Sequence, residues 1–172
     1  MQRPTADEIA RLLELQPNAT CGSVRVTYTS SISTAPGGLP VPFADVRPLG
    51  SGLYFLVTPN GPVRPHRIRN DQLYHYYLCD PLELFLLHSD APAERVIVGP
   101  DLVGGQRVQL LIPGNTFHTA RLLGDGEWFL GGSTEWPGVV VAEDVEIGDI
   151  DRLARDHPDV ASDIRSIAAS VQ

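Results

Sequence analysis

Hydrophobic and polar residues alternate with a period of two over much of the chain, which is typical of strands with one buried face. In the first such run, Val24, Val26 and Tyr28 alternate with polar neighbours over residues 23–29. Shorter β-rich runs follow, most of them bounded by Gly, Pro, Asn or Asp, at residues 53–58, 66–69, 72–78, 82–88, 95–98, 107–112, 116–123, 128–131 and 139–145. Many short strands at close intervals predict a mainly β fold, an antiparallel sandwich or jelly roll.

The two ends of the chain have helical periodicity instead. Thr5 and Glu8 have the spacing of a capping box in front of an apolar stripe, which predicts an N-terminal helix over residues 6–15. Asp149 is placed to cap a helix, and Pro158 separates it from a second apolar stripe, so residues 149–171 are expected to form short C-terminal helices.

Residues 30–50 are rich in Ser, Pro and Gly and predict a long irregular connection between the first two strands. Residues 23–146 are expected to form one barrel, and the flanking helices complete it. We therefore predict a single domain over residues 1–172.

Composition and charge exclude several classes of function. All 13 basic residues are arginine and the formal net charge is -8, so the chain has no Schiff-base lysine and is not expected to bind nucleic acid. No apolar run is long enough to cross a bilayer and the N-terminus lacks the apolar core of a secretory signal, so no membrane contact and a cytoplasmic location are expected. Cys21 and Cys79 are isolated and predict neither disulfides nor a zinc site.

The stretch PHRIRNDQLYHYYLCDPLEL, residues 65–84, has the highest concentration of chemically reactive side chains. It resembles the hallmark of the DUF985 (cupin 5) family of the cupin superfamily, in which a His and a short turn precede an acidic pair, a His beside an aromatic residue, and Asp-Pro-Leu-Glu-Leu. Residues 99–105, 112–121, 137–138 and 151–153 resemble later family blocks in the same order. The resemblance implies a cupin double-stranded β-helix, a jelly-roll barrel with short terminal helices.

Cupins direct histidines from two hairpins into one barrel mouth, and the resemblance assigns this position to His66 and His118. Ile68 replaces the second histidine of the first motif, and Gln72 stands where Glu is expected. Two alternatives stay open. One divalent ion (Fe, Mn, Ni or Zn) binds to His66, Gln72 and His118, or no metal binds, because a neutral amide is a weaker ligand without charge.

The residues that follow Gln72 include further candidates. Strict alternation places Tyr74 and Tyr76 on one face and His75 and Tyr77 on the other, so both pairs face the cavity only if a bulge intervenes. An inward phenol can orient a ligand or donate a proton, whereas the alternative for the tyrosines is packing in the core or at a dimer interface. His75 is either a second ligand contact or part of a packed interface.

Two charged residues are also candidate substrate contacts. Arg64 has the chemistry to hold a carboxylate or phosphate at the barrel mouth, and the alternative is a solvated strand face. Glu83 is either a carboxylate in the cavity or a charge on its rim.

The resemblance implies a cupin that binds a small molecule. The leading hypothesis is a non-redox isomerase, epimerase or lyase for a sugar-like or carboxylate-bearing metabolite, since the family is similar in fold to deoxysugar nucleotide epimerases. His66 or His118 would be the base, and Tyr74 or Tyr76 the acid. The alternatives are a metal-dependent oxygenase or isomerase and a binding protein without catalysis.

Cupins commonly exchange an N-terminal strand between two copies, so the resemblance also implies a homodimer. An apolar sheet face with Leu84, Leu86 or Tyr77 would then be buried at the interface.

Overall fold

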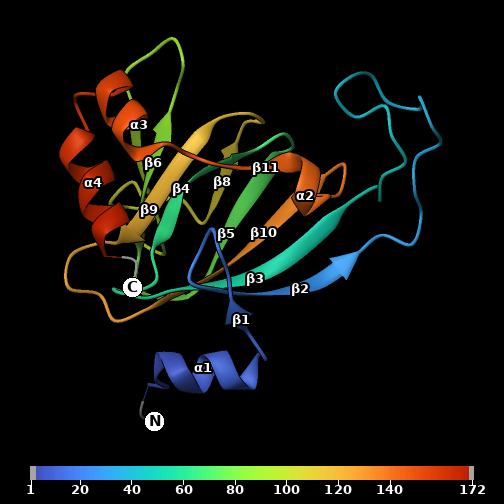
Figure 1. Ribbon diagram of the computed structural model, residues 1–172. Coiled ribbons are helices and arrows are strands. Elements are labelled where there is room, and N and C mark those ends of the chain that lie inside the picture. The colour runs from blue at the N-terminus through green and yellow to red at the C-terminus, as the bar shows by residue number, and fades with distance from the viewer. Residues whose placement is uncertain (1–2, 171–172) are drawn as a thin grey trace.

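The computed structural model describes residues 3–170, which form two antiparallel sheets that face each other (Figure 1). The first sheet has the order β1-β2-β3-β10-β5-β8, with the bounds β1 Gln16–Pro17, β2 Ser23–Thr29, β3 Ser51–Val57, β10 Phe129–Trp136, β5 Asp71–Cys79 and β8 Gln109–Ile112. The second has the order β11-β4-β9-β6-β7, with the bounds β11 Val145–Ile147, β4 Val63–Ile68, β9 Phe117–Leu122, β6 Leu82–Leu87 and β7 Glu94–Val98. The mainly β fold predicted from the sequence, with antiparallel sheets and short terminal helices, is confirmed.

The main core fills the space between the two sheets. Its largest members are inward side chains of alternating residues on both sheets, among them Phe55, Tyr74, Leu82, Leu84 and Phe129. Because the alternation is continued across neighbouring strands, one face of each sheet is apolar over most of its length and becomes polar only toward the cavity described below.

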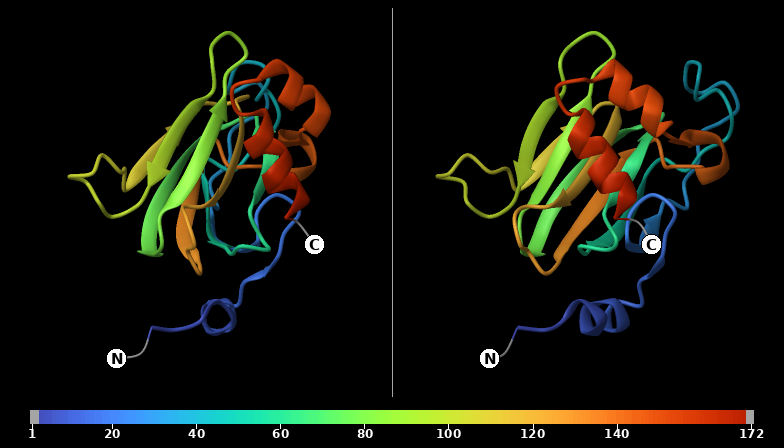
Figure 2. Two further views of the ribbon diagram at one scale, coloured as in Figure 1. Left: turned by 90° about the vertical axis from the view of Figure 1, so that its left-hand side faces the viewer. Right: turned by 60° about the vertical axis from the view of Figure 1, so that its left-hand side comes forward.

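Short helices cover the outer faces. Helices α3 (Ile150–Asp156) and α4 (Ala161–Ala169) lie against the second sheet (Figure 2), where Ile164 and Ile167 pack on Phe85 and Leu87. Residue 171, the predicted end of these helices, lies outside the described residues. None of the helices that the structure describes is both long and apolar enough to span a bilayer.

The N-terminal helix is shorter than predicted. Helix α1 (Ala6–Leu12) has the expected capping box of Thr5 and Glu8, but Glu14 adopts a left-handed backbone with φ of 54°. That conformation ends a right-handed helix, so the apolar side chain of Leu15 continues the contact with the first sheet from outside the helix.

The prediction of a strand at residues 139–145 is wrong. The segment forms the short helix α2 (Val141–Asp144) and only then enters β11. The valine-rich sequence favours a strand, but the Asp144 carboxylate accepts a hydrogen bond from the Val140 amide at 2.7 Å and pairs with the buried Arg47 at 2.6 Å. These tertiary contacts override the local β propensity.

Candidate functional site

Three neighbouring strands of the first sheet place polar side chains in one row. Glu135 on β10 is paired in register with Ser51 on β3 and with Gln72 on β5. One step along the strands, Ser133 lies between Leu53 and Tyr74. Because residues paired in register point to the same face, these side chains all face the second sheet.

The second sheet supplies the two histidines. His66 on β4 is paired in register with His118 on β9, and their ring centroids are 4.3 Å apart. His118 reaches across to the first sheet, where its Nε2 lies 3.0 Å from the hydroxyl of Tyr74. The predicted meeting of the two motif histidines is therefore present, and Tyr74 joins them to the opposite sheet.

A cavity of about 410 Å³ opens beside this cluster. Its polar lining comes from Cys21, Ser51, His66, Gln72, Tyr74, Ser133 and Glu135, together with the 18–20 segment. Most of the remaining lining is apolar and comes from Val24, Leu53, Phe55, Ile68, Val139, Val141, Val145 and Ile147. A largely apolar cavity with a few converging polar groups is the usual form of a small-molecule site.

Burial determines the protonation states of the two imidazoles. His66 is 4% exposed, and desolvation lowers its pKa from 6.5 to about 4. His118 is fully buried, and desolvation together with the neighbouring His66 holds its pKa well below 6.5. Both rings are therefore neutral at physiological pH.

Hydrogen bonds indicate which ring nitrogens carry the protons. The carbonyl oxygen of Arg64 is 2.7 Å from Nδ1 of His66 and can only accept, so Nδ1 donates and Nε2 keeps its lone pair. Tyr74 is buried and its pKa lies well above 10, mainly through desolvation, so its phenol is protonated. His66 thus offers an acceptor on the cavity wall. By the same argument Nδ1 of His118 donates to the Thr116 carbonyl at 3.4 Å, so the phenol of Tyr74 donates to Nε2 of His118.

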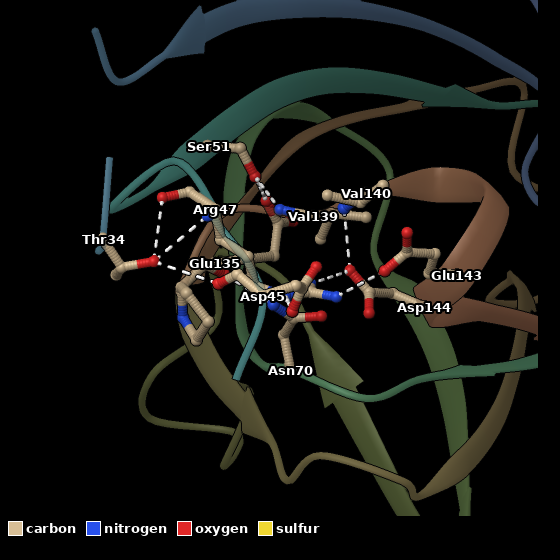
Figure 3. A network of polar contacts seen from close by, with 11 residues as sticks. Thr34, Asp45, Arg47, Ser51, Asn70, Glu135, Val139, Val140, Glu143 and Asp144 are labelled. Carbon is tan, nitrogen blue, oxygen red and sulfur yellow. Dashed lines mark hydrogen bonds and ion pairs between the residues drawn. The ribbon is translucent and has the colours of Figure 1, made fainter. Parts of the chain in front are cut away.

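Sequence reasoning missed Glu135. The residue is 3% exposed, and one carboxylate oxygen accepts a hydrogen bond from the hydroxyl of Ser51 at 2.6 Å (Figure 3). The other carboxylate oxygen accepts a hydrogen bond from the hydroxyl of Ser133. The alternation of Ser133 and Glu135 on one strand could have indicated that both side chains point inward, but a strand was predicted only to residue 131. Ser51 and Ser133 were not proposed either. Cys21, a further cavity residue that was not proposed, comes from an isolated bridge to Val63 that local periodicity does not reveal.

Three of the predicted aromatic candidates lie outside the cavity lining. The hydroxyl of Tyr76 donates to the Cys79 carbonyl at 2.7 Å, and its ring packs against Phe129. His75 and Tyr77 point to the opposite face of the sheet, where the rings stack with centroids 6.2 Å apart. The alternation did not decide which side of this strand lines the cavity. The structure shows that it is the side with Tyr74.

The two charged candidates also lie elsewhere. Arg64 is exposed, and only its backbone contacts the site: its carbonyl accepts from His66 and its amide donates to the Thr20 carbonyl at 2.7 Å. Glu83 is on the outer face of β6, where its carboxylate binds Arg121 at 2.7 Å and also contacts Arg95 beneath α4. Neither residue is part of the cavity lining.

The three residues predicted to form one apolar face at a dimer interface do not lie on a common exposed face. Leu84 and Leu86 belong to the buried core between the sheets and cannot contact a second copy, whereas Tyr77 is 43% exposed. The homodimer itself stays a prediction.

Comparisons with known proteins agree with the fold. The model of the family described as "Cupin superfamily (DUF985)" matches residues 7–146. The chain belongs to this family. Among solved structures, this cupin is similar to a hypothetical protein from Leishmania major (TM-score 0.83, 23% identity, 95% of this chain and 98% of that one). A protein from Shewanella oneidensis gives TM-score 0.83 and 23% identity over 96% of this chain and 98% of its own.

A more distant structure is a cupin-2 domain protein from Rhodospirillum rubrum, with TM-score 0.53 and 17% identity over 89% of this chain and 83% of that one. At these identities the structural likeness shows the fold alone. A comparison with curated proteins gives no match.

The side chains of this cupin do not fit the metal centre that the resemblance implies. Between residues 3 and 170, no group of three or more His, Cys, Asp or Glu side chains could hold one metal ion. In the predicted set of His66, Gln72 and His118, the Nε2 of His118 is already bonded to Tyr74, and Gln72 presents an amide without charge. We therefore derive no chemical step through a metal.

Proposed function

We propose that this cupin binds a sugar-like metabolite in the cavity and is a non-redox enzyme, an isomerase, epimerase or lyase that transfers a proton at the bound molecule. The observation that carries the proposal is the continuous contact of His66, His118 and Tyr74 beside one cavity. His66 and His118 are 4.3 Å apart between ring centroids, and Tyr74 is 3.0 Å from His118. An acceptor and a donor of protons are therefore available at the same wall.

Each residue has a defined part in this proposal. His66 accepts a proton at Nε2, because Nδ1 is fixed as a donor to the Arg64 carbonyl. Tyr74 donates its phenolic hydrogen to Nε2 of His118, which positions the hydroxyl, and in the proposed reaction it turns this proton to the bound molecule. The apolar wall holds the carbon skeleton of the ligand and excludes water from the reacting atoms.

The lining favours a sugar-like over a carboxylate-bearing metabolite. Of the residues that line the cavity in the described chain, none is an arginine, and the chain has no lysine. A ligand carboxylate would face Glu135 without a cationic partner, whereas sugar hydroxyls can donate to His66 and to Glu135.

A second candidate function, ligand binding without catalysis, is favoured by one observation. Burial lowers the pKa of His66 to about 4. A base with so low a pKa removes a proton from carbon poorly at neutral pH. The two candidates differ in whether a bound ligand exchanges hydrogen with solvent.

Ligand binding is tested first, with a panel of neutral sugars and the melting temperature as the readout. A sugar that binds the folded state is expected to raise the melting temperature of the wild type. His66→Gln should abolish this increase. His75→Gln, which alters a histidine on the outer face of the first sheet, should retain it. Equal increases in both variants would contradict the assignment of His66.

Catalysis is tested by incubating the stabilising sugar with the protein in D₂O and following deuterium incorporation by mass spectrometry. The enzyme proposal predicts incorporation by the wild type and a loss of about 100- to 10,000-fold in Tyr74→Phe. Binding without incorporation supports the second candidate and contradicts the first.

A further inference from the structure

Glu135 is a buried carboxylate on the cavity wall. It occupies the middle of the row formed with Ser51 and Gln72, and only 3% of the residue is exposed. Ser51 donates to one carboxylate oxygen at 2.6 Å, and Ser133 donates to the other. A carboxylate can accept about four hydrogen bonds, so both oxygens retain acceptor capacity.

Within the described residues, Glu135 has no ion-pair partner. The nearby guanidinium of Arg47 binds the carboxylates of Asp45, Glu143 and Asp144, at 2.7, 3.0 and 2.6 Å (Figure 3). All three of its nitrogens are thus engaged by other acids, and no arginine lines the cavity. The protein itself supplies hydroxyl donors to Glu135 but no positive charge.

The other titratable groups that line the cavity are His66, Tyr74 and Cys21, and all three are neutral. Desolvation lowers the pKa of His66 to about 4, raises the pKa of Cys21 to about 11 and raises that of Tyr74 well above 10. Desolvation also raises the pKa of Glu135 itself above 4.5. A buried carboxylate in a neutral, largely apolar wall is costly unless a cation joins it.

We propose that the ligand of this cavity carries a protonated amino group, which binds the carboxylate of Glu135 while ligand hydroxyls bind Nε2 of His66. This inference rests on the proposed function and narrows its substrate class to amino sugars and related amino alcohols. The ammonium group fills the remaining acceptor positions of Glu135, and the apolar lining contacts the carbon skeleton. Glu135 is thus the residue that determines specificity.

The test compares matched pairs of ligands that differ only in an amino or a hydroxyl group. The pairs are glucosamine and glucose, galactosamine and galactose, mannosamine and mannose, and cyclohexylamine and cyclohexanol. Binding is measured by calorimetry at pH 6.5, where the amines carry a positive charge, after treatment of the protein with EDTA. At least one amine is expected to bind about ten to a hundred times more tightly than its hydroxyl partner. This factor corresponds to the free energy that a buried hydrogen bond between charged groups contributes to binding.

Variants locate this preference on Glu135. Glu135→Gln should remove the advantage of the amine, so that the two members of each pair bind with similar affinity. Glu94→Gln is the matched control, because Glu94 is exposed on β7, and it should behave as the wild type. If Glu135→Gln fails to fold, the wild type still provides a test. Amine binding should strengthen as pH rises above 4.5 and Glu135 ionises, whereas hydroxyl binding should not.

Three outcomes overturn the inference. They are the absence of amine binding in every pair, equal affinity within every pair, and an amine preference that persists in Glu135→Gln. Binding of neutral sugars without an amine preference leaves the proposed function in place and removes only this inference. If no member of the neutral panel or of the amine series binds, the proposed function fails as well.

Discussion

Replacement of Arg47 by methionine is expected to lower the free energy of unfolding by about 3–5 kcal/mol. Both the Arg47 side chain and the Asp144 carboxylate that it binds at 2.6 Å are fully buried. Methionine keeps the apolar stem but removes the charge, so Asp144 is left in the interior without its partner. Urea denaturation measures the loss, and an unchanged slope of the transition indicates that both proteins unfold in the same way.

Arg152→Met is the matched control for this substitution. Arg152 pairs with Asp156 at 3.5 Å, but the two side chains are 72% and 55% exposed, so the loss should stay below about 1 kcal/mol. Asp144→Asn in the Arg47→Met background should recover part of the stability, since it removes the unpaired charge. Similar losses in Arg47→Met and Arg152→Met would show that burial adds nothing to the Arg47 network.

The same substitution should affect the cavity. Arg47 joins the long 30–50 connection to α2, and Val141 and Ala142 of α2 line the cavity. A ligand that stabilises the wild type should therefore bind less tightly to Arg47→Met than to Arg152→Met.

Acidification from pH 7 to pH 4 is expected to destabilise the fold by about 3 kcal/mol through His66 alone, with a further contribution from His118. Burial lowers the pKa of His66 in the folded state from 6.5 to about 4, while the unfolded chain retains the ordinary value. Between these two values the unfolded state binds a proton that the folded state does not. The stabilisation is therefore complete above pH 6.5 and is lost as pH falls toward 4.

Urea denaturation at a series of pH values tests this expectation. The decrease in unfolding free energy between pH 7 and pH 4 should be about 3 kcal/mol smaller in His66→Gln than in the wild type. The carboxylates titrate in both proteins, so their contribution to the pH dependence of the unfolding free energy cancels in the comparison. His75→Gln should keep most of the wild-type dependence, because His75 is only partly buried. The same pH dependence in all three proteins would contradict a buried, neutral His66.

The period-two pattern determined most of the strands, but it left open which face of the 72–78 segment points inward. It placed Gln72 and Tyr74 together and opposite to His75, as the structure has them. It could not orient Glu83, because all six residues of β6 are buried. The second sheet is covered on one face by the first sheet and on the other by α3 and α4, so both faces of β6 exclude water.

The sequence by itself therefore determined most of the local structure, the family, and the two motif histidines. Only the tertiary structure decided which side chains meet beside the cavity. Ser51 and Glu135 are 84 positions apart, and the row that they form with Gln72 follows from the order and register of three strands. Strand order depends on long-range hydrogen bonding and on burial of both sheets together, and the alternation within a single strand does not contain that information.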